Sequence, residues 1–86
     1  MDNRTIAGRL TAQAHKLETE RSNLFRVKAY RRAAQTILGL DRPVETIVAD
    51  QGRKGLQRLP GIGSHLAHTI ENLVRTGEFR SLRNEG

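Results

Sequence analysis

The sequence contains no cysteine and no tryptophan, and only two prolines and three aromatic residues among its 86. The absence of cysteine excludes disulfides, thiolate metal sites and thiol nucleophiles. No apolar run approaches the roughly 20 residues that span a membrane, and the first four residues lack the apolar core of a signal peptide. We therefore expect a cytoplasmic protein.

The chain is small and basic, with 86 residues, 36% apolar content and a net charge of +6. This size predicts one domain, and the apolar content argues against disorder. Nine basic and four acidic residues give residues 1–43 a net charge of +5, whereas six and five give residues 44–86 a net charge of +1. The basic surface fits a polyanion, a membrane surface or an acidic protein, or it is simply a solvated helix face. Five basic residues lie within residues 21–32: Arg21, Arg26, Lys28, Arg31 and Arg32.

Apolar residues recur at helical spacing along the chain, and no window alternates strictly as a strand would. The pattern predicts an all-α fold, a compact bundle of four to five short helices. The first helix covers about residues 4–20, with Asp2 or Asn3 as its N-cap. The second begins at an Asn23 cap and ends with Gly39 at the C′ position.

Proline and glycine residues mark where helices begin and end in the second half of the chain. Pro43 fits the first turn of a third helix. Gly52 and Gly55 then loosen the chain before one short helical turn at residues 54–59. A fourth helix begins at a Ser64 cap.

The last helical signals lie near the C-terminus. Gly77 stops the fourth helix, and Phe79 and Leu82 favour a short final helix. The apolar positions expected to face inward on the four main helices are Ile6, Leu10, Ala14, Leu17, Val27, Tyr30, Ala34, Ile37, Leu38, Val44, Ile47, Val48, Leu66, Ala67, Ile70, Leu73 and Val74.

The most informative segment is residues 59–64, Leu-Pro-Gly-Ile-Gly-Ser. Gly61 and Gly63 allow a ligand to approach the backbone closely, and Ile62 between them can plug into the core and pin the turn. The segment precedes a helix, whose N-terminus attracts anions. A dinucleotide fingerprint is excluded because no strand precedes it and Leu66 stands where its third glycine belongs, and a Walker loop lacks its Gly-Lys-Ser/Thr. A phosphate bound here would position DNA without reading its sequence.

Leu-Pro-Gly-Ile-Gly, followed by a helix that ends at Gly77, resembles the helix-hairpin-helix motif, a DNA-binding element without sequence specificity. Residues 23–34, Asn-Leu-Phe-Arg-Val-Lys-Ala-Tyr-Arg-Arg-Ala-Ala, extend the likeness to the N-terminal domain of family X DNA polymerases over roughly residues 4–83. The resemblance implies a helical domain that binds DNA at gaps and breaks, with its hairpin at residues 59–64. We expect residues 1–86 to be one such domain, the N-terminal part of a longer protein.

The resemblance also implies functional positions. Arg26, Tyr30 and His65 correspond to a pocket that could still hold a 5′-phosphate. A monovalent cation, Na⁺ or K⁺, would bridge hairpin carbonyls to a DNA phosphate, and no other cofactor is expected. The carbonyls that hold it would belong to Gln57, Leu59 and Ile62. The residues expected to contact DNA are Gly61, Gly63, Ser64, His65, Arg58, Arg26, Tyr30 and Arg31.

The sequence departs from the family at the group that performs its lyase chemistry. The family forms a Schiff base through a lysine on the helix after the hairpin, and Thr69 stands at that position. A hydroxyl cannot form an imine, so we expect no enzyme activity from this chain. Two further positions of that site are Phe25 and Ser81, and Lys28 is expected to be exposed.

His65 and His68 lie on one helix face with Glu71 a turn further on, a spacing that raises the question of a metal site. Structural zinc needs four ligands, and no cysteine or further clustered histidine is available. We therefore expect solvated or phosphate-facing histidines and no metal held by side chains.

These observations predict a monomer that binds duplex, gapped or nicked DNA through its phosphates, without sequence specificity and without a membrane. Its role would be DNA repair or the recognition of gaps and ends. In a bacterium it would associate with the nucleoid when bound to DNA. Two alternatives stay open: a 5′-deoxyribose-phosphate lyase domain of a family X polymerase, and a helical protein–protein interaction module.

Overall fold

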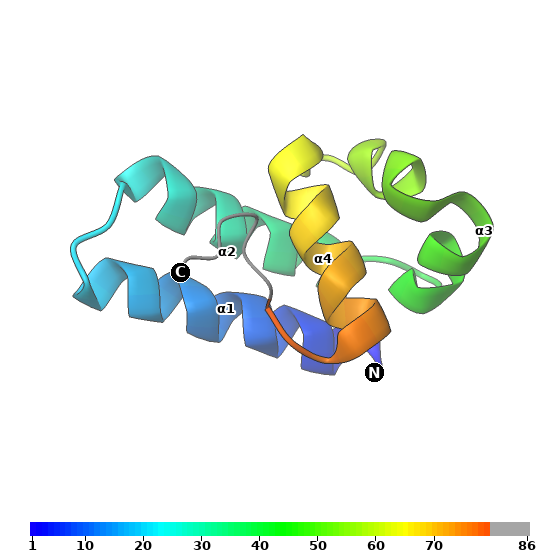
Figure 1. Ribbon diagram of the computed structural model, residues 1–86, viewed down its shortest axis with the longest axis horizontal. Helices are drawn as coiled ribbons and strands as arrows, with labels where there is room; N and C mark the ends of the chain where they lie inside the picture. Colours follow the sequence, from blue (N-terminus) through cyan, green and yellow to red (C-terminus); the bar gives the residue numbers. More distant parts are fainter. Residues whose placement is uncertain (80–86) are drawn as a thin grey trace.

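The computed structural model describes residues 1–79 and contains four helices in that range (Figure 1). They are α1 (Asn3–Thr19), α2 (Leu24–Leu38), α3 (Val44–Gln57) and α4 (Ser64–Thr76). The all-α expectation is therefore confirmed. None of the helices within residues 1–79 has the length and apolar character needed to cross a bilayer. The short final helix expected around Leu82 lies outside the described residues.

α1 and α2 lie antiparallel along each other, and α3 packs on α4 as a second pair (Figure 1). α4 also contacts both α1 and α2, so it joins the two pairs. One core fills the space between them. All the apolar positions expected to face inward are buried there except Val74, which is half-buried, and Leu38.

Leu38 is 58% exposed, which corrects its assignment to the inward stripe of α2. It is the last residue of the helix and follows Ile37, which is fully buried. Consecutive residues of a helix point about 100° apart, and at this end of α2 the core lies on the side of Ile37 and leaves Leu38 outside it. The structure also buries Ala33 next to Ala34, which broadens the apolar face of α2.

Side-chain caps read from the sequence begin α1 and α2. The carboxylate of Asp2 accepts a backbone N–H of the first turn at 2.8 Å, and the amide oxygen of Asn23 does the same at 2.7 Å. At the other end of α2, Gly39 has φ −84° and not the left-handed conformation of a C′ glycine. Its N–H donates to the carbonyls of Gln35 and Thr36, so the last turn tightens without reversing.

The start of α3 is capped by a side chain from α1. Its own N-cap residue, Pro43, supplies no side-chain hydrogen bond. Instead the amide oxygen of Asn3 accepts the N–H of Val44 at 2.7 Å, and the Asn3 amide donates to the carbonyl of Arg42 at 2.9 Å. This arrangement ties the beginning of the chain to the loop between α2 and α3.

α3 consists of two helical segments that meet at Gly52, whose φ of 63° and ψ of −149° interrupt the helix. The break confirms the expected loosening at Gly52, but the same expectation is wrong for Gly55. Gly55 is buried, and a Cβ there would lie 2.9 Å from the Ile47 side chain and 2.7 Å from that of Gln51. The glycine is needed for close packing of the short segment that leads into the hairpin.

Candidate nucleic-acid interface

The turn between α3 and α4 is built around one glycine and one buried side chain. Gly61 has φ +78°, in the left-handed region that glycine adopts without strain. The Ile62 N–H donates to the carbonyl of Leu59 at 3.2 Å and closes the turn. The Ile62 side chain is buried in the core, as expected, so the glycines on either side are left at the surface.

This turn is docked on α2. The Thr36 hydroxyl donates to the carbonyl of Pro60 at 2.8 Å. The stem of Arg32 lies directly against Gly61, since a Cβ built on that glycine would be 2.6 Å from the Arg32 Cδ atom. α2 therefore fixes the position of the hairpin and brings an arginine beside it.

The N-terminus of α4 is open to an external acceptor. The structure corrects the expected Ser64 cap: Gly63 is the N-cap, in extended conformation with φ −90°, and Ser64 is already helical. The Gly63 carbonyl accepts the N–H of Ala67 at 2.9 Å, but no side chain in the described residues caps this helix. The first N–H groups of α4 thus lie beside an exposed glycine, where a phosphate could accept them.

A pocket of about 220 Å³ lies where α1, α2 and α4 meet. It brings together Arg26, Tyr30 and His65, the three residues expected to form a phosphate pocket. Lys16 of α1 also lines the pocket, so α1, α2 and α4 each contribute one basic side chain to it. The remaining lining residues are Gln13, Thr69 and Phe79.

Phe79 forms one wall of the pocket and is held by two contacts. Its ring meets that of Tyr30 edge-to-face, with centroids 6.4 Å apart and an interplanar angle of 74°. The Arg9 guanidinium lies 5.5 Å from the Phe79 centroid and donates to the Gly77 carbonyl at 3.1 Å. Tyr30 itself is buried, so its ring supports the pocket more than it offers surface to a ligand.

The surroundings of His65 in this pocket shift the pKa of its imidazole. Partial desolvation of its imidazole, with the positive charges of Arg26 and His68 nearby, lowers the pKa of His65 below its ordinary value of 6.5. The free pocket therefore disfavours an added positive charge. A bound anion would offset that effect and favour the protonated ring.

The chain matches the family model of the helix-hairpin-helix domain over residues 1–79. It belongs to this family. Helix-hairpin-helix domains generally bind nucleic acid. Comparison with curated protein sequences found no match. The finer likeness to the N-terminal domain of family X polymerases stays a prediction.

Some of the other basic side chains lie near the hairpin, and others lie away from it. Lys28 is exposed, as expected, and Arg58, which is expected to contact DNA, is exposed as well. Arg31, expected at the DNA-contacting surface, forms an ion pair with Glu18 at 2.7 Å and lines neither the phosphate pocket nor the hairpin. The α2 arginine beside the hairpin is Arg32, which the sequence reasoning left out of the site.

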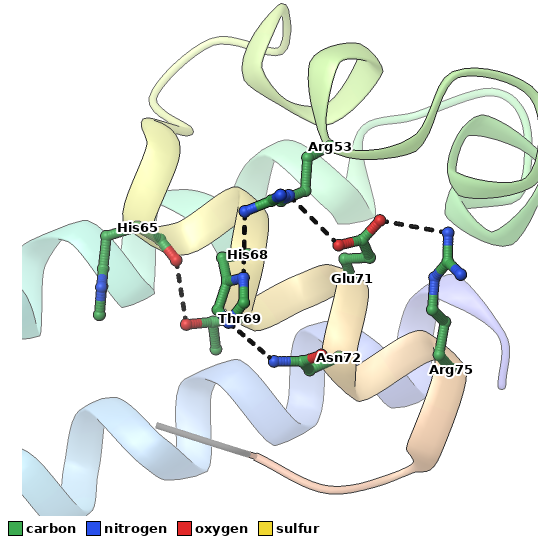
Figure 2. Close-up of polar contacts among 7 residues, drawn as sticks. All are labelled: Arg53, His65, His68, Thr69, Glu71, Asn72 and Arg75. Carbon is green, nitrogen blue, oxygen red and sulfur yellow. Dashed lines mark hydrogen bonds and ion pairs between the residues drawn. The ribbon is translucent and has the colours of Figure 1, made fainter. Parts of the chain in front are cut away.

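Thr69, which the resemblance to family X polymerases aligns with the lyase lysine, points back to its own helix (Figure 2). Its hydroxyl donates to the carbonyl of His65 at 3.1 Å, and the residue is buried. This i−4 hydrogen bond is common for threonine within helices. Thr69 therefore fills the base of the phosphate pocket and presents no nitrogen to it.

A second polar cluster holds the broken helix α3 to α4 (Figure 2). Arg53 follows the kink and contacts His68 Nδ1 at 3.2 Å and Glu71 at 3.4 Å. Asn72 lies 3.1 Å from His68 Nε2, and Arg75 pairs with Glu71 at 3.2 Å. Within residues 1–79 no three His, Asp or Glu side chains are grouped as metal ligands.

The two hairpin glycines should respond differently to substitution. In Gly61→Ala the left-handed backbone costs about 1–2 kcal/mol, and the new Cβ must displace Arg32 from its position. In Gly63→Ala the φ is ordinary and no atom lies within 4 Å of the added Cβ. Urea unfolding followed by circular dichroism should show this loss for Gly61→Ala and a change within about 0.5 kcal/mol for Gly63→Ala. Equal losses would contradict the assigned turn geometry.

Proposed function

We propose that this helix-hairpin-helix domain binds DNA through its phosphates without reading sequence, and serves DNA repair by recognising gaps and ends. The observation that carries the proposal is the exposed hairpin at the uncapped N-terminus of α4, with Arg32 alongside. Backbone N–H groups recognise a phosphate oxygen irrespective of the base attached to it. The high arginine content adds charge of the sign that DNA attracts.

The pocket between α1, α2 and α4 supports a second contact, to a terminal 5′-phosphate. Lys16, Arg26 and His65 approach it from three different helices, so their relative positions are set by the core and not by a mobile loop. A terminal phosphate carries more negative charge than one within a strand, and several converging donors favour it. Such a site would distinguish a gap with a phosphorylated end from intact duplex.

A monovalent cation held at the hairpin when DNA is bound is the third part of the proposal. The carbonyls of Gln57, Leu59 and Ile62 lie at the end of α3 and in the turn, where the negative end of the helix dipole favours a cation. The Leu59 carbonyl accepts the N–H of Ile62 and keeps a second lone pair. These carbonyls would hold Na⁺ or K⁺, which would supply positive charge for one DNA phosphate.

A protein–protein interaction module remains the alternative from a different class, and the dependence of binding on salt separates the two. If about four to six basic groups engage phosphates, log K should fall with log[salt] at a slope of roughly −4 to −5, equally for two unrelated duplex sequences. Gly63→Val should weaken binding because its side chain blocks the approach to the helix N-terminus. Gly8→Val is the control for an added side chain at the surface. Gly8 is an exposed position of α1, and no atom lies within 4 Å of a Cβ built there. A flat salt response, or strong preference for one sequence, would refute the proposal.

Gapped DNA with a 5′-phosphate should bind better than its unphosphorylated twin, by about 1–3 kcal/mol or roughly 5- to 150-fold. Lys16→Gln should reduce this difference, whereas Lys54→Gln, an equal loss of charge on α3, should leave it unchanged. A bound phosphate favours protonated His65, so the difference should grow as pH falls from 7.5 to 6. His65→Gln should remove this growth, because protonation of the phosphate itself in this pH range lowers its negative charge and acts in the opposite direction. Equal affinity for the two DNAs at every pH would exclude the phosphate pocket.

We further propose that the chain binds DNA without lyase activity, because Thr69 offers no amine at the position where the resemblance to family X polymerases implies a lysine. Lys16 is the lysine that lines the same pocket. Incubation with incised abasic DNA and borohydride should therefore trap no more adduct than a free amine of equal concentration does. Efficient trapping at Lys16 would establish the lyase alternative instead.

A further inference from the structure

Among residues 1–79, Phe25 is the most exposed large apolar residue, with 82% of its surface accessible. It lies in the first turn of α2, where the Asn23 side chain holds its backbone N–H at 2.7 Å. The ring therefore projects from a capped helix and not from a loop. Neither the core nor the phosphate pocket uses it.

Phe25 belongs to a groove that leads to the hairpin. The groove has a volume of about 280 Å³ and is lined by Phe25, Lys28, Ala29, Arg32 and Gly61. The four α2 residues are spaced i, i+3, i+4 and i+7, so they form one continuous stripe along the helix. α2 thus presents this stripe on one side and the Arg26 and Tyr30 side chains to the phosphate pocket.

The composition of the groove is specific in chemical terms. An accessible aromatic ring lies at one end, a glycine backbone at the other, and two cations lie between them. An apolar protein segment would desolvate Lys28 and Arg32 without neutralising them. A nucleotide of single-stranded DNA satisfies both parts, because its base can stack on the ring while its phosphates meet the cations.

We propose that the Phe25 groove binds an unpaired DNA base, stacked on the Phe25 ring, with Lys28 and Arg32 on the adjoining phosphates. The proposal rests on the proposed DNA binding at the hairpin and adds a site for the single-stranded part of a gap. Gly61 belongs to both surfaces, so a strand held at the hairpin can continue directly into the groove. A closed duplex has no free base face to offer and would not use Phe25.

The test compares two DNAs and two adjacent exposed residues. The DNAs are a single-stranded oligo(dT) and a dumbbell duplex without free ends, and the variants are Phe25→Ala and Leu24→Ala, whose parent side chain is 64% exposed. The Phe25→Ala variant should bind oligo(dT) about 5- to 150-fold more weakly, because it loses base stacking. Dumbbell binding should change less than about twofold, and Leu24→Ala should leave both affinities within that margin.

Each other outcome overturns a different claim. Equal losses of oligo(dT) binding in Phe25→Ala and Leu24→Ala would show general apolar contact and refute stacking at Phe25. An equal loss of dumbbell and oligo(dT) binding in Phe25→Ala would place the ring on the duplex. If the unaltered chain binds neither DNA, the proposed function fails and the groove proposal fails with it.

A second measurement reports on the ring directly. The chain has no tryptophan, so Phe25→Trp introduces a single fluorophore at the proposed site. Stacking on a base should quench it when oligo(dT) is added, and an oligonucleotide of abasic residues with the same phosphates should quench it far less. Leu24→Trp is the matched control and should respond weakly to both. Binding of oligo(dT) without quenching at Phe25→Trp would refute the stacked arrangement.

Discussion

The docking of the hairpin on α2 is the contact on which the surface of this domain depends. Ile62 enters the core, the Thr36 hydroxyl holds the carbonyl of Pro60, and the Arg32 stem lies across Gly61. A buried side chain, a hydrogen bond and a close backbone approach thus fix one turn from three directions. Because the turn precedes α4, the same contacts also fix where the first N–H groups of α4 point.

α2 consequently borders both the pocket and the groove beside the hairpin. Its one side meets α1 and α4 around the pocket of Arg26 and His65, and its neighbouring side meets the hairpin around Arg32. The segments that complete these surfaces are held in turn. Asn3 caps α3 from α1, and Arg53 joins the segment after the Gly52 kink to α4. A rigid frame of this kind suits recognition of a backbone shape, since the donors need no rearrangement to meet phosphates.

The resemblance to family X polymerases implies a lysine for lyase chemistry at one position of the pocket, and this chain has a threonine there. Thr69 occupies the base of the pocket and donates its hydroxyl within its own helix. The pocket nevertheless keeps basic side chains from three helices, and partial desolvation of the ring, with Arg26 and His68 nearby, lowers the pKa of His65. The proposed binding of an anion and the cleavage of a sugar have different requirements in such a cavity, because charge is sufficient for the first and a placed amine is needed for the second.

The sequence by itself determined the four helices, the Gly52 break, the buried Ile62 and the meeting of Arg26, Tyr30 and His65. The helices and the break follow from apolar periodicity and glycine positions, and the buried Ile62 follows from a motif whose geometry is local. The meeting of Arg26, Tyr30 and His65 was expected only from the resemblance to family X polymerases. The tertiary structure decided features that depend on how helices cross: that Lys16 enters the pocket, that Arg32 and not Arg31 lies at the hairpin, that Gly63 caps α4, and that Phe25 opens onto a groove. Spacing along one helix shows which residues share a face. Only packing against other helices decides what each exposed face meets.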